Sequence, residues 1–374
     1  MKVIHKALFQ QTSTAIAWAL LGFVLIFSFF NALEEVSKLG RESLLLKGET
    51  FTIFTLFQLV LLEIPFLAYD LIPICVLIGA VYAMSRLAVQ SEFTVMRSGG
   101  FSPMSAIYLM GVLGFVFATM TFLTGDYLSP WADAKRTMIK AQFDGGVSTG
   151  MTGGWLKEQR DNQGYATVNV GELLPSGEIG RVRIGEFDHQ GKLLQRMDAQ
   201  RARLENQRLE LTDLKRTIYP MLSQSDQNVV LKEEHLNYFE WETSIEPEMV
   251  SATLLNKQKM NTLDLYRVIQ HLQTNKQNSQ RQEIEFWSKL IYPLSCVVMA
   301  LMALPFAYLH FRQSGVSLYV FVGIMLGISF FLLSNMFSYI GNIQGWSPWL
   351  AAASPSLLYV SLSMAAVAWR VLRR

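Results

Sequence analysis

Long apolar runs alternate with one charged block along this chain. Six runs of about 20 residues are long enough to cross a ~30 Å hydrocarbon core as helices. Three precede the charged block and three follow it, so the pattern predicts two groups of three membrane-spanning helices. The predicted spans are Thr14–Ala32, Ile64–Met84, Met104–Thr124, Phe286–Leu309, Val316–Ile340 and Trp349–Val371.

The middle of the chain has the composition of a folded domain outside the bilayer. Between Asp126 and Glu283 there are 20 Lys/Arg and 22 Asp/Glu residues, which leaves 12 and 8 for the remainder. Turn signals recur there at short intervals, and alternating stretches such as Tyr165–Val170 lie between them. We expect an antiparallel β-sandwich, followed by a capped amphipathic helix from Thr262 that leads back to the membrane.

The predicted fold class is an α+β membrane protein with an extracytoplasmic β domain inserted between two transmembrane halves. Residues 1–130 form the first half, with a short cytoplasmic helix near 90–99, and residues 131–260 form the β domain. A connecting helix occupies residues 261–283, and residues 284–374 form the second half.

Basic residues in the short flanks predict the orientation. Lys2 and Lys6 precede the first span, Arg86 and Arg97 lie between the second and third, and Arg312 lies between the fourth and fifth. With six spans they all fall on one side, which is then cytoplasmic together with both termini. The charged block is placed on the opposite side.

The apolar stretch at 51–62 is too short to cross the membrane. We expect a separate interfacial helix there, ended by the Glu-Ile-Pro sequence at 63–65. Glu63 and Asp70 lie near the outer end of the second span. Acids at such positions can line a proton path, but no acidic partner occurs mid-membrane on another span, so interfacial placement with access to water is favoured.

Composition narrows the class of protein. Apolar residues make up 51% of the chain and charged residues 17%, with a mean hydropathy of +0.25 and a formal net charge of +2, which indicates a membrane protein. No basic tract suggests nucleic acid as a partner. Cys75 and Cys296 lie inside apolar runs, which predicts buried thiols rather than a disulfide or a thiolate metal site.

Signatures of catalysis are missing from the sequence. No Gly-x-x-x-x-Gly-Lys-Ser/Thr loop is present, so the chain is not expected to bind ATP in that way. The five histidines lack the spacing of metal ligands, and no Gly-x-Ser-x-Gly elbow occurs. We expect a non-catalytic chain that holds no metal and no cofactor.

The cytoplasmic segment QSEFTVMRSGGFSPMS at 90–105 is a candidate partner site. It predicts a short amphipathic helix that carries Glu92, Phe93, Val95 and Met96 and ends at Gly99-Gly100, before the next span begins at Ser102-Pro103. Such a helix suits a groove on a cytosolic partner. The residues alone favour this interpretation and that of a simple connector equally.

Basic residues also gather near the outer ends of the first and third spans. Arg136 and Lys140 are four residues apart and would share one helical face, and Lys38 and Arg41 follow the first span. Together they could form a phosphate-binding rim. The pattern alone favours a solvated charged helix paired with local acids.

Three separated segments identify a family. The segment QSEFTVMRSGGFSPMS, the segment GDYLSPWADAKRTMIKAQFDGG at 125–146 and the run FWSKLIYPLSCVVMALMALPFAYLHFR at 286–312 resemble the lipopolysaccharide-export permeases, the LptF/LptG family. The last run and SPWLAAASPSLLY at 347–359 are closer to its LptG branch. The resemblance covers nearly the whole chain, including the order of spans and β domain.

The resemblance implies a permease subunit of an ABC-type exporter in the bacterial inner membrane, with a periplasmic β-jelly-roll domain. Its implied partners are an LptF-like permease, two copies of a cytosolic LptB-like P-loop ATPase that uses ATP, a periplasmic LptC/LptA-like bridge protein and lipopolysaccharide. The helix at 92–96 would couple to the ATPase, with Glu92 as the acidic contact.

The resemblance also assigns lipid-handling residues. Lys140 matches a basic position associated with lipid phosphates, and the second such position falls on Thr137, beside Arg136. A lateral gate is implied between the first and fifth spans. In this sequence it would involve Phe27, Phe30, Val320 and Met325.

Two other classes remain open at this stage. The chain could be a permease for a different envelope lipid or for a lipoprotein. It could instead be a non-transporting membrane anchor that displays a β-sandwich binding module, although one helix would suffice for that purpose.

Overall fold

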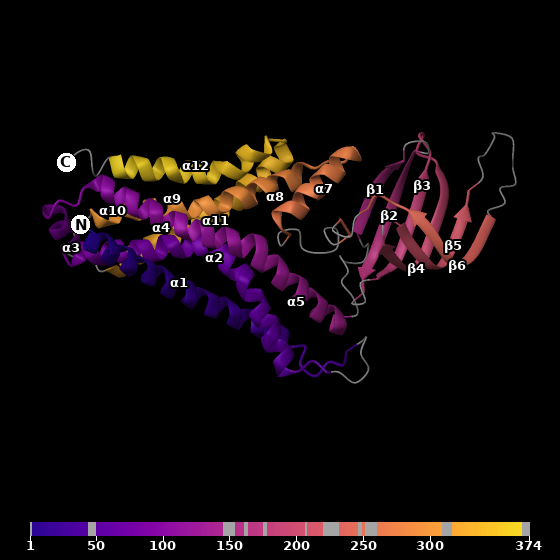
Figure 1. Cartoon of the computed structure of the whole chain (residues 1–374), viewed down its shortest axis with the longest axis horizontal. Helices are drawn as coiled ribbons and strands as arrows, with labels where there is room; N and C mark the ends of the chain where they lie inside the picture. Colours follow the sequence, from indigo (N-terminus) through magenta and orange to yellow (C-terminus); the bar gives the residue numbers. More distant parts are fainter. Residues whose placement is uncertain are drawn as a thin grey trace. The chain divides into compact units, whose positions relative to one another are not determined.

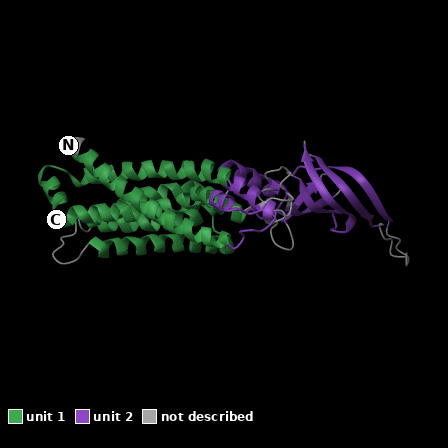
Figure 2. Cartoon of the chain, turned by 90° about the horizontal axis from the view of Figure 1, so that it is seen from below, with its two compact units in different colours: residues 1–36, 60–132, 280–374 green, residues 37–59, 133–279 purple. Residues whose placement is uncertain are grey.

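The computed structural model describes residues 2–43, 50–144, 154–160, 164–174, 178–205, 208–219, 232–245, 249–250, 260–308 and 316–368. The chain forms two compact units (Figure 2). We call residues 1–36, 60–132 and 280–374 the helical unit, and residues 37–59 and 133–279 the sheet unit. Each unit is described by itself.

Six helical segments among the described residues are long and apolar enough to cross a membrane, which confirms the predicted spans (Figure 1). The β domain between the third and fourth spans is confirmed as well. The helices are α1 (Lys2–Val36), α2 (Ile53–Val89), α3 (Glu92–Ser98), α4 (Pro103–Leu123), α5 (Ser129–Asp144), α7 (Thr262–Thr274), α8 (Gln280–Ile291), α9 (Ser295–Met302), α10 (Leu304–Ala307), α11 (Val316–Gln344) and α12 (Pro348–Val367).

The prediction of a separate interfacial helix at 51–62 is wrong. Instead α2 runs without a break from Ile53 to Val89, with Pro65 and Pro73 inside it. A proline removes one backbone hydrogen bond, which a helix packed among neighbours tolerates. The 37 residues of α2 are about 56 Å long at 1.5 Å per residue, and the expected interfacial segment forms about the first three turns of this helix.

Glu63 also differs from expectation. Water access was expected at the end of a broken helix, whereas its side chain is only 7% exposed. The continuity of α2 explains the difference, because Glu63 lies within the helix rather than at its start.

The third and fourth spans are not simple α-helices. After α4 the chain continues through a π-helical turn, η1 (Thr124–Leu128), directly into α5. The fourth span comprises α8, the 3₁₀ turn η3 (Tyr292–Leu294), α9 and α10, with Pro293 and Pro305 near its two interruptions. A π-turn widens a helix by one residue and re-aims its side chains.

Helix α2 is packed closely on two opposite faces. The backbone of Ile16 in α1 lies where a Cβ on Gly79 would be. On α11, Gly323 lies against Val81 and Gly327 against Ile74. At 100° per residue, Ile74 and Val81 share a face that lies about 200° around α2 from Gly79. Thus α1 and α11 are separated by α2 within this chain.

A polar interlock joins α2, η1 and the fourth span inside the helical unit. The Nζ of Lys289 on α8 lies 3.8 Å from Oδ1 of Asp126 on η1, and both side chains are 9% exposed. The ring of Tyr69 on α2 occupies the space where a Cβ on Gly125 would be. The hydroxyl of Tyr292 donates a 2.6 Å hydrogen bond to the carbonyl oxygen of Asp70. These contacts hold three spans in one register.

The sheet unit contains one antiparallel sheet of six described strands in the order of the chain. They are β1 (Gly154–Arg160), β2 (Gly164–Leu173), β3 (Ile179–Phe187), β4 (Leu193–Glu205), β5 (Arg208–Ile218) and β6 (Lys232–Glu242). The predicted antiparallel β domain is confirmed, and its described strands form a meander in which neighbours along the chain are neighbours in the sheet. The short links between β2 and β5 pair each strand with its successor, which leaves no exchange of neighbours in the described sheet.

Alternating residues put the sheet's apolar side chains on one face. They form a core with Trp241, Ile245 and Val250; strand members include Val168, Ile184, Met197 and Leu211. Charged pairs line the other face. Burial would raise the pKa of Asp198, but hydrogen bonds from Arg196 and Arg183 outweigh it and hold this pKa below its ordinary value.

The capped helix expected after the β domain is confirmed as α7. Its cap is Asn261, whose side-chain oxygen accepts a 2.7 Å hydrogen bond from the backbone N–H of Asp264. The buried positions Leu265, Val268 and Ile269 form its apolar face. One face of α7 is therefore buried rather than solvated.

The interlock generates a stability prediction. Lys289→Met should remove the ion-pair partner of the buried Asp126 carboxylate and cost about 3–5 kcal/mol, a typical penalty for breaking a buried ion pair. The paired variant Asp126→Asn/Lys289→Met should recover most of that loss. Thermal unfolding of the full chain in detergent measures both. Additive losses in the paired variant would show that the two charges do not depend on each other.

Candidate functional site

The cytoplasmic segment forms α3, which is anchored by one aromatic side chain. Phe93 is 2% exposed, and its ring lies 5.0 Å from the ring of Tyr308 and 6.2 Å from that of Phe101. The guanidinium of Arg97 lies 5.2 Å over the Tyr308 ring, a cation–π contact, and His5 of α1 packs edge-on against Phe101. The anchor therefore joins α3 to the ends of the first, third and fourth spans.

The two ends of α3 explain how Phe93 and Phe101 meet. Ser91 adopts a left-handed conformation with φ of 57°, so the chain turns sharply between α2 and α3. At the other end the N–H of Phe101 donates to the carbonyl of Met96 and that of Gly100 to Arg97, a glycine-based helix stop. Ser102 then caps α4 by accepting from the N–H of Ser105. The end and the start predicted from the sequence are both confirmed.

The opposite side of α3 is open. Glu92 is exposed, Val95 is 69% exposed, and Met96 is half-buried against the core. The helix thus presents one carboxylate and one apolar side chain on a short, firmly anchored element. That arrangement is suited to insertion into a groove of another protein.

The segment after α1 folds against α5 in the sheet unit. Glu42 and Thr50 form an isolated antiparallel bridge, and the hydroxyl of Ser43 donates 2.9 Å to the carbonyl of Gln142. The rings of Phe51 and Phe143 lie 5.1 Å apart in a small apolar cluster. Residues from the end of the first span and the end of the third are therefore brought together.

The four predicted rim cations belong to these two adjoining segments. Lys38 is half-buried and Arg41 exposed, next to the Glu42 bridge; Arg136 and Lys140 are half-buried on α5. On α5 they flank the side chains that pack on the loop, since Ile139 belongs to the same apolar cluster. The structure joins the segments, and all four cations lie in the sheet unit.

The predicted gate residues are not brought together within this chain. Phe27, Phe30 and Met325 are 42%, 59% and 50% exposed, and Val320 is half-buried. Their helices, α1 and α11, lie on opposite faces of α2. Both helices expose most of their apolar surface, with only 6% of the α1 span and 17% of the α11 span buried.

Comparison with known proteins decides the family. A family model described as lipopolysaccharide export system permease LptF/LptG matches residues 6–373. The chain belongs to the LptF/LptG family. It is 23% identical to the lipopolysaccharide export system permease protein LptG of Escherichia coli (strain K12) over 379 residues, which covers 100% of this chain and 98% of that protein. The identity to LptG of Haemophilus influenzae is 26% over 295 residues, 77% of this chain and 78% of that protein.

Membership in the LptF/LptG family agrees with the six apolar helices, and the chain is a multi-pass inner-membrane protein. Both relatives are LptG proteins, as the final run of the sequence indicated. The family is one of permeases in a lipopolysaccharide export system. Roles of individual residues in this LptF/LptG chain remain predictions.

Sequence reasoning missed the contacts that hold the LptF/LptG helices in place. Lys289 could have been found, because it is a charged residue near the start of the fourth predicted span, where charge is rare. Tyr308 and Phe101 carry no such signal, since aromatic residues are common at the ends of spans. Their role appears only when the third and fourth spans are brought to α3.

The aromatic anchor generates a prediction about assembly. Tyr308→Ala should loosen α3, because Phe93 loses its nearest ring, whereas Tyr308→Phe keeps the ring and should behave like the original chain. Hydrogen exchange of residues 92–101 in the detergent-solubilised chain measures this. Equal protection in the alanine and phenylalanine variants would show that the ring does not hold α3.

Proposed function

We propose that this chain is one permease half of an ABC-type exporter that takes lipopolysaccharide from the outer leaflet of the inner membrane and passes it to a periplasmic bridge. An LptF-like chain is the second half, and two copies of an LptB-like ATPase supply energy from ATP. The chain itself is non-catalytic and binds no cofactor in this proposal. Both termini are cytoplasmic and the sheet unit is periplasmic, connected to an LptC/LptA-like bridge protein.

The observation that carries this proposal is α3. Its Phe93 is buried among aromatic rings of the third and fourth spans, while Glu92 and Val95 face solvent. A partner that pushes on the exposed side therefore moves the spans through the anchor rather than bending a loose loop. We infer that this partner is a transport ATPase, an inference supported by membership in a family of export-system permeases.

The placement of α1 and α11 supports a paired permease. Because α2 separates them, a gate between a first and a fifth span needs the corresponding helices of another chain. The exposed residues Phe27, Phe30 and Met325 would then line two such gates, with Val320 at the edge. An apolar lining suits lipid chains, whose transfer into water costs about 0.8 kcal/mol per CH₂.

The rim supplies the polar part of the proposed site. Lipopolysaccharide is anionic, and Lys38, Arg41, Arg136 and Lys140 provide charge-assisted donors for phosphates. They lie on two segments fixed to each other by the Ser43–Gln142 hydrogen bond and the Phe51–Phe143 contact. In this proposal the acyl chains enter a cavity between the two paired permeases while the phosphates stay at the rim. Closure of that cavity, driven by ATP, then expels the lipid.

Charge reversal on α3 tests the coupling. Glu92→Arg should abolish association with the ATPase and reduce transport at least tenfold, because an exposed carboxylate at a contact is replaced by a cation. Copurification and lipopolysaccharide release from proteoliposomes are the measurements. Glu205→Arg, an exposed reversal on β4, is the matched control. Normal assembly and export by the Glu92→Arg chain would remove the coupling assignment.

Charge reversal at the rim tests the substrate. Arg136→Glu/Lys140→Glu should weaken photocrosslinking of lipopolysaccharide several-fold while the permease pair and its ATPase still copurify. Arg203→Glu/Lys215→Glu, on the exposed face of the sheet, is the control. Unchanged crosslinking would rule out the rim as a binding site for lipopolysaccharide. Copurification of a different envelope lipid or a lipoprotein would change the substrate, and a chain isolated without ATPase or lipid would favour an anchor.

A further inference from the structure

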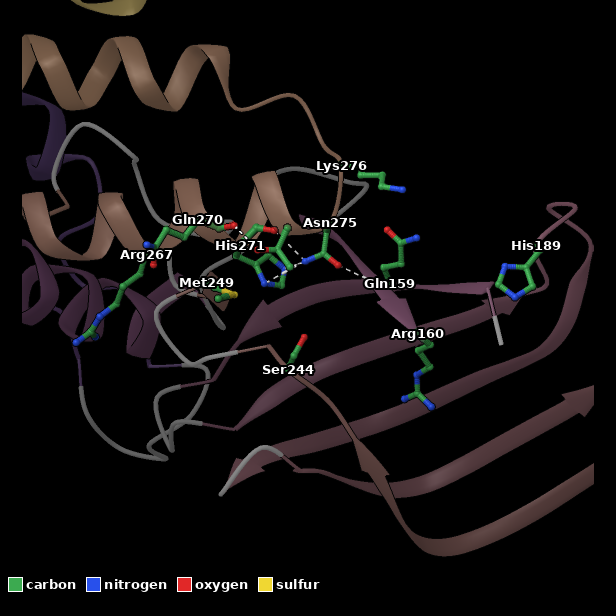
Figure 3. A pocket seen from close by; sticks show the side chains of 11 residues that line it. Gln159, Arg160, His189, Ser244, Met249, Arg267, Gln270, His271, Asn275 and Lys276 are labelled. Atoms are coloured by element: carbon green, nitrogen blue, oxygen red, sulfur yellow. Dashed lines mark hydrogen bonds between the residues drawn. The ribbon is translucent and has the colours of Figure 1, made fainter. Parts of the chain in front are cut away.

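A polar cleft of about 830 Å³ lies in the sheet unit where α7 meets the end of β1 (Figure 3). It shares no residue with the rim or with α3. Its volume is within the range of small-molecule sites, about 300–1,000 Å³. Ten of its eleven lining residues, all except Met249, carry polar side chains, which points to a hydrophilic ligand.

The floor of the cleft is rigid. Asn275, 5% exposed, accepts a 2.7 Å hydrogen bond from the backbone N–H of Gln159, and its amide nitrogen donates 2.9 Å to the carbonyl of His271. The same nitrogen lies 3.2 Å from the His271 ring. Figure 3 shows these three side chains together in the middle of the cleft. The bond between the Asn275 side chain and the Gln159 backbone fixes the C-terminal end of α7 to β1.

Arg160 is held in place on the sheet side. Its guanidinium lies 4.4 Å over the Trp241 ring and donates 2.6 Å to the carbonyl of Glu242. It also lies 3.6 Å from a carboxylate oxygen of Glu186. The charge of Arg160 is therefore shared with an acid that does not itself line the cleft.

Cationic side chains lie at both ends of the cleft. Arg267 lies at one end, and Lys276 and His189 lie at the other (Figure 3). No Asp or Glu is among the described residues that line it. The carboxylate of the nearby Glu158 accepts hydrogen bonds from the hydroxyl of Thr243 and from the backbone N–H of Ser244. Among the described lining residues, Arg160, Arg267 and Lys276 are cations, and amide and hydroxyl groups lie between the two ends.

We propose that this cleft binds a phosphorylated sugar, with the sugar hydroxyls on the Gln159–Asn275–His271 floor and phosphates towards Arg267 and Lys276. An acyl chain would leave these polar groups desolvated without partners, which is costly. A bare phosphate would occupy only one end. The inference rests on the proposed function for the source of the ligand, the polar head of lipopolysaccharide, but the site is separate from the membrane rim.

The test uses the full chain in nanodiscs of neutral phosphatidylcholine. The probe is the water-soluble glycan obtained by removing all acyl chains from an inner-core lipopolysaccharide, measured by calorimetry beside its dephosphorylated form and inorganic phosphate. Arg267→Gln/Lys276→Gln should weaken binding of the phosphorylated glycan about tenfold, or ~1.4 kcal/mol. Arg267→Lys/Lys276→Arg should keep it, which separates lost charge from lost folding.

The matched control is Arg208→Gln/Lys215→Gln, which removes two exposed cations from β5, outside the cleft. It should leave binding unchanged. Equal affinity in the cleft and control variants would overturn the proposal, and so would inorganic phosphate that binds as well as the glycan. Binding of the intact lipid but not of the free glycan would also overturn it, since the ligand would then be recognised through its acyl chains.

The outcome is distinguishable from that of the exporter proposal. If the reconstituted complex exports lipopolysaccharide but the chain does not bind the glycan, only the cleft proposal is ruled out. If glycan binding depends on Arg267 and Lys276 but the reconstituted complex moves no lipid, the cleft proposal stands and the exporter proposal is ruled out.

Discussion

The buried interlock around Asp126 and Lys289 is the constraint on which the helical unit depends. Charges are costly at such depth, and the two side chains compensate each other only while η1 and α8 keep their register. The π-turn at Thr124–Leu128 re-aims Asp126 towards that partner, and Gly125 gives the Tyr69 ring of α2 its place. Three spans are thereby fixed as one body, and the remaining helices are arranged around it.

That body has a mechanical consequence for the helices at its surface. Helices α1 and α11 each contact α2 through glycines at close approach, on faces about half a turn apart, and otherwise expose apolar side chains. Small contact areas allow motion more readily than large ones. The aromatic anchor places α3 on the fixed spans through Tyr308 and Phe101. A push on α3 would thus be transmitted to the fixed body through this anchor.

Periodicity and composition predict elements better than their joints. The six spans, the inserted β domain, the stop of α3 at Gly99-Gly100 and the start of α7 follow from run length, strand alternation and capping chemistry. The continuity of α2 through Pro65 does not, because proline signals a break unless neighbouring helices support it. The order of the described strands comes from the structure, because alternation predicts strands but not which strands pair. Candidate residues on α3 and α5 could be predicted from charge and spacing. Their neighbours could not, because they come from segments distant in the sequence, as in the contact of Ser43 with Gln142.

The rim and the cleft show how one sheet unit can present two kinds of polar surface. Rim cations stand on helix α5 and on the bridged segment after α1, and a buried apolar cluster holds these two segments together. The cleft between α7 and β1 is lined by amides, imidazoles and cations, and the nearby Glu186 lies against Arg160 of this lining. Because the cleft's floor is built by a buried asparagine that also joins α7 to the sheet, its geometry follows from folding and needs no ligand to form.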